Sequence, residues 1–196
     1  MKRIGRLFRP YLAFSADAPA RAAPAEDRAG RFRALILPHM DAAYTLARYL
    51  ARDPVLAEDI VQEAFLRAFR AFDDCRGEAP RAWLLAIVRN CFLSSTAAAR
   101  PMAAEADAPE PIDRDDPEVI LLRQREAEHV RETIANLPEP FREAIVLRDL
   151  EELSYKEIAA ITEVPIGTVM SRLARARRML GDLLLPSEEA GREATS

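Results

Sequence analysis

Apolar residues recur at three- and four-residue spacing through most of the chain, and this period predicts helices rather than strands. In the first half the pattern predicts three helices: one over 34–51, one that begins after Asp53-Pro54, and one that begins near Ala79-Pro80. Asp at the N-cap and Pro at the first helical position both favour a helix start. No alternating strand pattern occurs in the sequence, so we expect an all-α protein.

The second of these helices has a wide apolar stripe, which predicts that one of its sides is buried in a helical bundle. The opposite side carries acidic, amide and arginine side chains, as expected for a side that faces solvent or a partner. The stripe consists of Ile60, Val61, Ala64, Phe65, Ala68, Phe69 and Phe72.

In the second half, the apolar spacing predicts helices over 119–136 and 141–150, followed by a short helix, a tight turn and a longer helix. The short helix starts with Ser154 and Glu157, which have the spacing of a capping box. In such a box each side chain bonds a free amide at the helix start. Pro165 suits the first turn of the last helix, because its missing N–H is not needed there.

The last helix has an apolar side, with Val169 and Leu173, and a basic side; no Asp or Glu occurs over 165–181. A short helix, a turn and a basic helix form the layout of a helix-turn-helix, whose second helix enters the major groove of DNA. A solvated arginine face on an ordinary bundle helix is the alternative. The capping box and the turn favour the helix-turn-helix. The arginines of the basic side are Arg172, Arg175, Arg177 and Arg178.

The overall charge hides this local basic surface. The chain has 28 Lys plus Arg and 32 Asp plus Glu, a net charge of −4, which alone would argue against a nucleic-acid partner. Residues 101–118, however, hold seven acidic residues, four prolines and a single arginine. Such a segment cannot bury enough apolar surface to fold alone, so it is predicted to be a linker.

The sequence offers no group of residues suited to catalysis or to holding a cofactor. Cys75 and Cys91 are too few for a disulfide framework or a zinc motif, and His39 and His129 are far apart in the chain. We therefore expect no cofactor, no metal and no enzymatic activity. No apolar run approaches the ~18 residues of a membrane span. Two cysteines with no disulfide pattern fit a cytoplasmic location.

These patterns divide the chain into two small helical domains joined by a flexible acidic linker, the second domain containing the helix-turn-helix. We expect a flexible basic arm over 1–31, the first domain over 32–98 and the linker over 99–117. The second domain is expected over 118–186 and a disordered tail over 187–196. Residues 1–33 hold eight basic and three acidic side chains. An arm with this basic excess can touch DNA weakly, although most such arms bind nothing specific.

With both halves considered together, the chain resembles an extracytoplasmic-function (ECF) sigma factor of bacterial RNA polymerase. In the first half the resemblance is carried by EDIVQEAFLRAFR (58–70) and RGEAPRAWLLAIVRN (76–90), and in the second half by residues 137–177. One helix-turn-helix would be a weak sign, because many regulators have one. Two blocks in this order, on either side of an acidic linker, are much more specific.

The resemblance implies that the first block binds the clamp helices of the largest polymerase subunit and opens the minus-ten promoter element. Opening DNA requires a pocket that compensates for unstacking a base, on the order of a few kcal/mol, rather than a catalytic group. Trp83 also fits a core residue, and the acidic side of 58–63 also fits a solvated surface. The matches to polymerase contacts are Asp59, Gln62, Glu63, Leu66 and Arg67. The matches to minus-ten contacts are Arg76, Gly77, Glu78, Trp83, Arg89 and Asn90.

The second block resembles the domain that recognises the minus-thirty-five element as duplex. Arg175 is the residue expected at a base edge, where it would contribute ~1–3 kcal/mol of discrimination; a phosphate contact is the alternative. Met170, Ala174 and Ala86 depart from residues common in the family, so the promoter sequence is not specified. The candidate contacts are Arg148, Lys156, Thr168, Met170, Ser171, Arg172, Arg175 and Arg178.

The partners that the resemblance implies are core RNA polymerase, promoter DNA and an anti-sigma factor that restrains a stress or envelope-response regulon. No membrane insertion is expected. Two other functions stay open: a sigma-like decoy that binds an anti-sigma factor, and a stand-alone helix-turn-helix regulator. A decoy needs no basic helix free of acids, and a stand-alone regulator leaves the first block unexplained.

Overall fold

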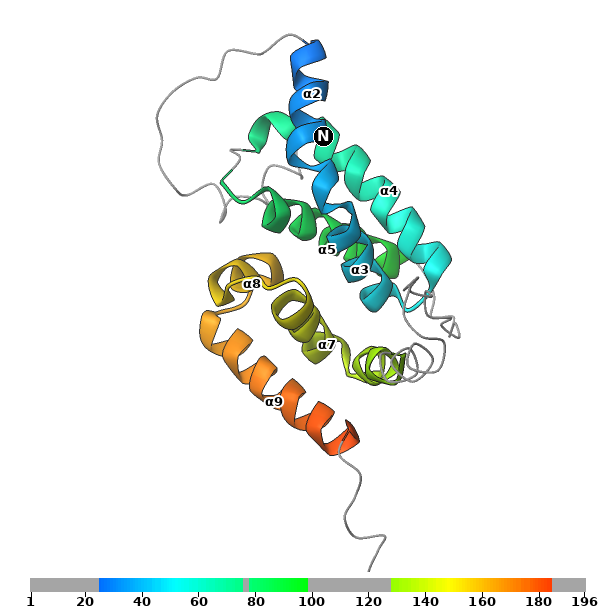
Figure 1. The fold of residues 1–196 in the computed structure, drawn as a ribbon, viewed down its shortest axis with the longest axis vertical. Coiled ribbons are helices and arrows are strands. Elements are labelled where there is room, and N and C mark those ends of the chain that lie inside the picture. Colours follow the sequence, from blue (N-terminus) through cyan, green and yellow to red (C-terminus); the bar gives the residue numbers. More distant parts are fainter. Residues whose placement is uncertain (1–24, 76–77, 99–127, 185–196) are drawn as a thin grey trace, which may run out of the picture.

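A computed structural model of the chain describes residues 25–75, 78–98 and 128–184 (Figure 1). The described residues form helices and turns and contain no strand, which confirms the all-α prediction. The expected linker and tail lie outside these residues, as do Arg76 and Gly77.

The first half is built on three helices, α3, α4 and α5, which pack against one another in all three pairings. The apolar stripe of α4 faces this core: Ile60, Ala64 and Ala68 are buried, whereas Phe69 stays 40% exposed. The elements of this half, in chain order, are α2 (Ala25–Leu35), a 3₁₀ turn η1 (Leu37–His39), α3 (Met40–Ala51), α4 (Pro54–Arg70), a 3₁₀ turn η2 (Phe72–Asp74) and α5 (Pro80–Ala98).

The expected start of α4 is confirmed. The Asp53 carboxylate accepts hydrogen bonds from the backbone N–H groups of Val55 and Leu56, at 2.8 and 3.2 Å. These two amides would otherwise have no partner within the helix, so the side chain fixes the point at which α4 begins. Pro54 follows as the first helical residue.

The segment before α3 differs from the prediction in two ways. Residues 25–31, expected to belong to a flexible arm, are helical because Arg28 donates a 2.7 Å hydrogen bond to the Phe69 carbonyl at the end of α4. The predicted helix over 34–51 is interrupted by η1. Pro38 lacks an N–H and disfavours the helical conformation of the residue before it, so the helix cannot continue through this position.

The second half consists of helical residues 128–136, then α7 (Glu139–Ile145), a π-helical turn η3 (Val146–Leu150), α8 (Tyr155–Thr162) and α9 (Ile166–Leu184). The helix predicted over 141–150 therefore starts two residues earlier and ends in a π-turn. Helices α7 and α8 pack against α9. The residues that fill this core are Ile145, Val146, Leu147, Ile158, Val169, Leu173 and Ala176.

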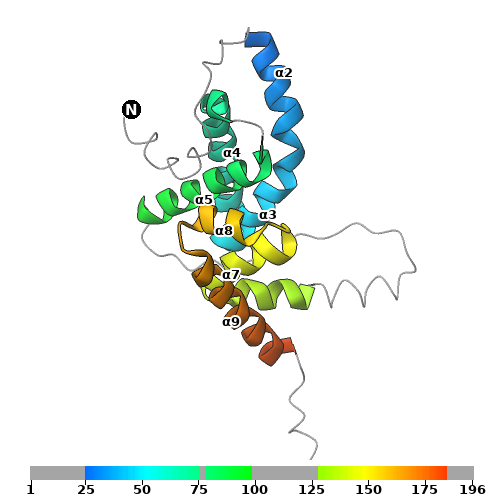
Figure 2. The same cartoon turned by 90° about the vertical axis from the view of Figure 1, so that its left-hand side faces the viewer.

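The two halves pack directly against each other. Helix α5 contacts α8, and α3 contacts both α7 and η3. Figure 1 shows the second half lying along the α3 and α5 side of the first, with α9 farthest from α4, and α8 also lies beside α5 in Figure 2. Among the described helices, none combines the length and the apolar character needed to cross a bilayer.

Candidate nucleic-acid interface

The turn between α8 and α9 has the geometry of a helix-turn-helix. The predicted capping box is present: the Ser154 N–H donates to the Glu157 carboxylate at 2.8 Å, and the Glu157 N–H donates to the Ser154 hydroxyl at 3.3 Å. Glu163 ends α8 in the left-handed conformation, with φ of 56°. After Pro165, the Thr168 N–H donates to the Pro165 carbonyl at 2.8 Å and starts α9. These local bonds set the direction in which α9 leaves the turn.

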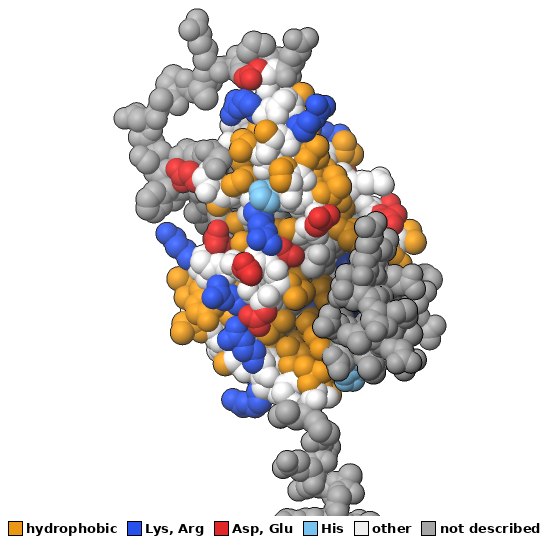
Figure 3. Space-filling view, viewed as in Figure 1, with side chains coloured by type: hydrophobic (Ala, Val, Ile, Leu, Met, Phe, Trp, Pro, Cys, Tyr) orange, Lys and Arg blue, Asp and Glu red, His pale blue; other side chains and the backbone are white. Residues whose placement is uncertain are grey.

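Helix α9 buries one side and exposes the other. Val169, Leu173 and Ala176 are buried against α7 and α8. In Figure 3, Lys and Arg side chains recur along the lower left of the molecule, the side that α9 occupies in Figure 1. Of the predicted minus-thirty-five residues on α9, Thr168 and Arg172 are half-buried, and the exposed ones are Met170, Ser171, Arg175 and Arg178.

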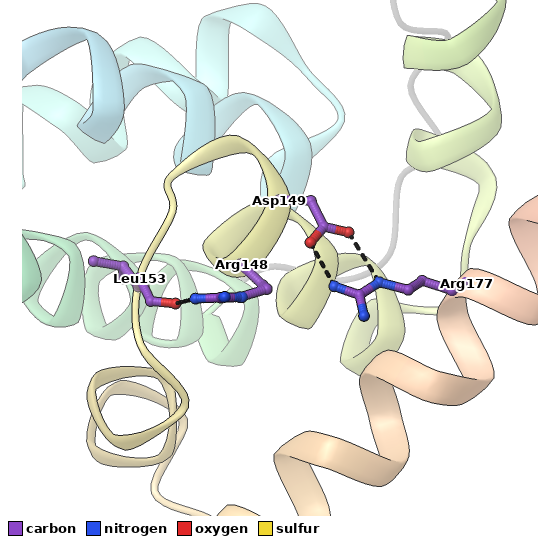
Figure 4. Close-up of polar contacts among 4 residues, drawn as sticks. All are labelled: Arg148, Asp149, Leu153 and Arg177. Atoms are coloured by element: carbon purple, nitrogen blue, oxygen red, sulfur yellow. Dashed lines mark hydrogen bonds and ion pairs between the residues drawn. The ribbon is translucent and has the colours of Figure 1, made fainter.

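One arginine of α9 is already paired within the half. The Arg177 guanidinium donates two hydrogen bonds to the Asp149 carboxylate of η3, at 2.7 and 3.3 Å (Figure 4). The hydrogen bond to Asp149 raises the pKa of Arg177. Because its charge is already balanced, Arg177 is a weaker candidate for DNA than Arg175. The Arg175 guanidinium lies 5.6 Å over the Phe141 ring and has no carboxylate partner among the described residues.

Arg148, predicted to touch the DNA backbone, is directed into the turn between η3 and α8. Its Nη1 donates a 2.7 Å hydrogen bond to the Leu153 carbonyl (Figure 4). Its guanidinium lies 5.1 Å over the Tyr155 ring. The side chain is half-buried. In this geometry Arg148 positions the start of α8. Lys156, by contrast, is exposed on α8.

Arg142 is a structural residue that the sequence patterns missed. It is 6% exposed, and its Nη1 donates to the carbonyls of Ala135 and Leu137, at 2.9 and 2.7 Å. Burial lowers the pKa of Arg142. These carbonyls lie where the chain leaves the helix over 128–136, so the buried arginine closes the corner before α7. In the sequence Arg142 stands between Phe141 and Glu143, and no local pattern indicated that it would be buried.

Of the predicted minus-ten residues of α5, Arg89 contacts the second half. Trp83 is 8% exposed, Asn90 is half-buried, and Glu78 is exposed ahead of the helix. Arg89 donates a 2.6 Å hydrogen bond to Glu143 of α7, and this pair is buried, at 15% and 5% side-chain exposure. Burial raises the pKa of Glu143, and the charge of Arg89 opposes that shift.

The predicted polymerase contacts lie along one side of α4. Asp59, Gln62 and Leu66 are exposed and are spaced three and four residues apart, so they line up on the helix. Glu63 and Arg67 are half-buried and form a 2.6 Å ion pair with each other. The hydrogen bond to Glu63 raises the pKa of Arg67. This side of α4 combines an acidic group, an amide and an exposed leucine.

Neither cysteine suggests a reactive or metal-binding site. Cys75 and Cys91 are both buried and reduced, and burial raises the pKa of Cys91 to about 11. A thiol with so high a pKa is protonated at neutral pH and is a poor nucleophile and metal ligand. Within the described residues, no cluster of three or more metal-binding side chains occurs.

Comparison with known proteins gives matches in both halves. The family model for sigma-70 region 2 matches residues 35–100, and the model for sigma-70 region 4 matches residues 127–180. The ECF RNA polymerase sigma-E factor of Escherichia coli K12 is 38% identical over 156 residues, which cover 74% of this chain and 81% of the relative. The matched segments contain the two blocks that carried the resemblance.

Solved structures with this fold extend the similarity across both halves. The sigma factor RpoE of Bartonella quintana, in complex with the anti-sigma factor NepR, matches with a TM-score of 0.65 and 28% identity. The match covers 82% of this chain and 98% of that one. CnrH, in complex with the cytosolic domain of CnrY, matches with a TM-score of 0.58 and 27% identity, covering 82% and 93% of the two chains.

Proposed function

The chain belongs to the extracytoplasmic-function (ECF) sigma factors, which direct promoter recognition and transcription initiation by bacterial RNA polymerase, and we propose how its surfaces divide that work. Helix α4 binds core polymerase, α5 and the loop before it engage the opened minus-ten element, and α9 reads the minus-thirty-five duplex. The protein acts in the cytoplasm, where core polymerase and promoter DNA are present.

The observation that carries this division is the contrast between two exposed helix faces. The outward side of α9 presents Ser171, Arg175 and Arg178 with no acidic residue between 165 and 181. Such a surface suits phosphate and base-edge contacts in the major groove. The exposed side of α4 presents Asp59, which would repel DNA phosphate and suits a basic protein partner instead.

Two residues of the minus-thirty-five set take positioning roles in this proposal. Arg148 bonds the Leu153 carbonyl, and Ser171 donates a 2.9 Å hydrogen bond to the Thr168 carbonyl. The Ser171 residue remains exposed, and its hydroxyl oxygen can still accept a hydrogen bond from a base. Arg148 instead holds α8 against η3, so its removal would weaken duplex binding indirectly.

We also propose that an anti-sigma factor controls this protein. Among the solved structures that match it, the sigma factor RpoE has the anti-sigma factor NepR bound, and CnrH has the cytosolic domain of CnrY bound. A regulon for stress or envelope response is the class of genes expected under such control. Co-purification with the full chain, followed by mass spectrometry, would identify that partner.

The experiment that tests the function is run-off transcription from genomic fragments, with purified core polymerase in the presence and absence of the protein. New start sites that depend on the protein would support the proposal and define both promoter elements. If no new start appeared while a small partner co-purified tightly, the assay would be repeated after that partner is removed. Continued absence of new starts would support the decoy instead.

Two sets of variants then separate the surfaces. Arg175→Ala should weaken binding to the identified duplex by roughly 5- to 150-fold, from a loss of ~1–3 kcal/mol, while leaving the affinity for core polymerase intact. Arg177→Ala, whose guanidinium is already paired with Asp149, is the matched control and should lose less. Equal loss of duplex and polymerase binding by Arg175→Ala would refute the division of surfaces.

The opposite pattern is expected on α4. Asp59→Ala combined with Gln62→Ala should weaken binding to core polymerase and leave duplex binding unchanged. Asp41, an exposed acid in the first turn of α3, provides a control of the same charge outside α4. Unchanged polymerase affinity in the double variant would show that this side of α4 is not the contact.

A further inference from the structure

The polar contacts between the two halves involve the helix that the proposed function assigns to the minus-ten element. Arg89 of α5 is bonded to Glu143 of α7 at 2.6 Å. Arg81, eight residues earlier and therefore about two turns away on the same side of α5, is bonded to Glu151, the residue that follows η3. Two arginines of one helix thus meet two carboxylates from the other half.

Both carboxylates are inaccessible to solvent in this arrangement. Glu143 and Glu151 are each about 5% exposed as side chains, whereas their arginine partners are 15% and 34% exposed. A buried carboxylate without a cationic partner is strongly unfavourable, and so is a buried guanidinium without an anion. The pairs therefore favour one particular docking of the second half on α5 over other arrangements of the two domains.

A third polar contact lies on α3. Arg52, which ends α3 in the left-handed conformation with φ of 58°, donates a 3.1 Å hydrogen bond to the Asn136 side chain. This hydrogen bond is exposed and its acceptor is a neutral amide, so it adds less than the two ion pairs, whose carboxylates are buried. Around these contacts, α3 packs on α7 and η3, and α5 packs on α8.

From this geometry we propose that the second half competes with DNA for α5: the carboxylates of Glu143 and Glu151 occupy the arginines that would otherwise hold promoter phosphates. The proposal rests on the assignment of α5 to the minus-ten element. A carboxylate is planar and a phosphate is tetrahedral, but a guanidinium binds either oxyanion through paired hydrogen bonds. The two anions therefore exclude one another at one arginine.

The closed arrangement leaves α9 in a different situation. Arg175 and Arg178 are exposed while the halves are docked, so duplex binding by α9 does not require opening. The docked second half covers parts of α5 and α3 and leaves the outward side of α9 uncovered. The affinity of the free chain for single-stranded DNA is then its intrinsic affinity multiplied by the fraction of open molecules, whereas its affinity for duplex is not reduced by closure.

The test compares two double variants that remove equal charge. Glu143→Gln with Glu151→Gln breaks the two pairs; Glu139→Gln with Glu152→Gln removes two exposed acids of the same segment. The radius of gyration is measured by small-angle X-ray scattering. Binding is measured by fluorescence anisotropy with random-sequence single-stranded DNA and, separately, with random-sequence duplex.

The pair-breaking variant should have a larger radius of gyration than the control variant and bind single-stranded DNA more tightly. The gain is about tenfold if ~10% of the wild-type chains are open. Two freed arginines should also steepen the salt dependence of single-strand binding by about 1.4, at ~0.7 for each phosphate contact. Duplex binding should change no more than it does in the control variant.

Two further variants keep the outcome decisive. Adding Arg81→Ala and Arg89→Ala to the pair-breaking variant should remove most of the gain, because the gain depends on the two freed guanidiniums. Exchanging the charges in the wild-type chain, Arg89→Glu with Glu143→Arg, recreates an ion pair at this position. That variant should therefore keep the radius of gyration of the wild type rather than the larger one of the pair-breaking variant. Opening without any gain in single-strand affinity over the control, or no opening at all, would overturn the competition.

Failure of the proposed function itself would look different. Arg89→Ala would then leave run-off transcription by the complete holoenzyme unchanged, because α5 would not contact the promoter even when the chain is held open by polymerase. The scattering measurement is independent of that result. It reports only whether the acid–arginine pairs hold the halves together.

Discussion

The two halves of this sigma factor are stabilised by different kinds of contact. The first half relies on the close packing of apolar side chains among α3, α4 and α5 and on a cluster of phenylalanine rings. The second half relies more on single polar side chains that fix where the backbone turns. The first is therefore suited to act as a scaffold, and the second to hold a recognition helix in a defined direction.

The phenylalanine cluster joins α2 to the end of α4. The Phe32 ring contacts Phe69 and Phe72 edge-on, with ring centroids 5.1 and 5.3 Å apart, and Phe65 at 6.4 Å. Edge-to-face pairs of this kind add to the stability gained from burial alone. The stabilisation is shared among several ring contacts, so a small shift of one side chain need not change the path of the backbone.

In the second half, individual hydrogen bonds decide the path of the chain. Arg142 holds the corner before α7, Arg148 holds the turn after η3, and Ser154 starts α8. Glu152 and Glu163 both take positive φ, at 51° and 56°, which non-glycine residues adopt at some cost. A half built in this way should be sensitive to the loss of specific donors as well as to the loss of core volume.

The largest effect is expected in the aromatic cluster. Phe72 is 2% exposed, and Phe72→Ala should lower the free energy of unfolding by about 3–5 kcal/mol, because it removes buried surface and leaves a cavity. Urea unfolding of the full chain, followed by far-ultraviolet circular dichroism, measures it. Phe72→Leu, which keeps much of the volume, should lose less. A loss below about 1 kcal/mol for Phe72→Ala would show that the cluster is not part of the core.

The helices of both halves were predictable because local patterns specify them. The apolar period located α4 and α9, Asp53 and Ser154 marked two helix starts, and Pro165 marked the turn. Helix α2 was missed because residues 25–31 are polar and Ala-rich. Their helical conformation depends on Arg28 and Phe32 contacting the end of α4, about forty residues later in the chain.

The next effect in size tests the polar side of the comparison. Arg142→Met keeps most of the side-chain volume but removes the donor to the Ala135 and Leu137 carbonyls. We expect a loss of about 1–3 kcal/mol in the free energy of unfolding, the cost of leaving a buried acceptor without a partner. Arg178→Met, at an exposed position of α9, is the control and should change little. Equal stability of the two variants would mean that the corner holds without Arg142.

Contacts that depend on the third dimension could not be predicted from spacing. Arg142 and Glu143 are adjacent charged residues in the sequence, a pattern typical of a solvated surface, yet both are buried. Arg142 satisfies carbonyls of its own half, while Glu143 meets Arg89, 54 residues earlier. The family resemblance predicts Arg89 as a DNA contact, but nothing in the sequence indicated an acidic partner from the other half.

A smaller effect is expected at the start of α8. Ser154→Ala removes the acceptor for the Glu157 N–H and should cost ~1 kcal/mol of stability. Ser154→Asp retains a side-chain oxygen at the N-cap and should recover most of the loss, because Asp is an equally good N-cap residue. The same unfolding assay measures both variants. If the Asp variant were as unstable as the Ala variant, the cap would not be the source of the effect.

The smallest effect is expected for the exposed pair on the recognition helix. The side chains of Arg177 and Asp149 are 50% and 38% exposed, so water and salt already screen their attraction. Asp149→Asn should therefore cost about 0–1 kcal/mol of stability, and less at high salt than at low salt. Urea unfolding at the two salt concentrations measures both values. A salt-independent loss of more than about 2 kcal/mol would mean that Asp149 holds η3 and α9 together as Arg142 holds its corner, and that the second half depends on its polar contacts even at the surface.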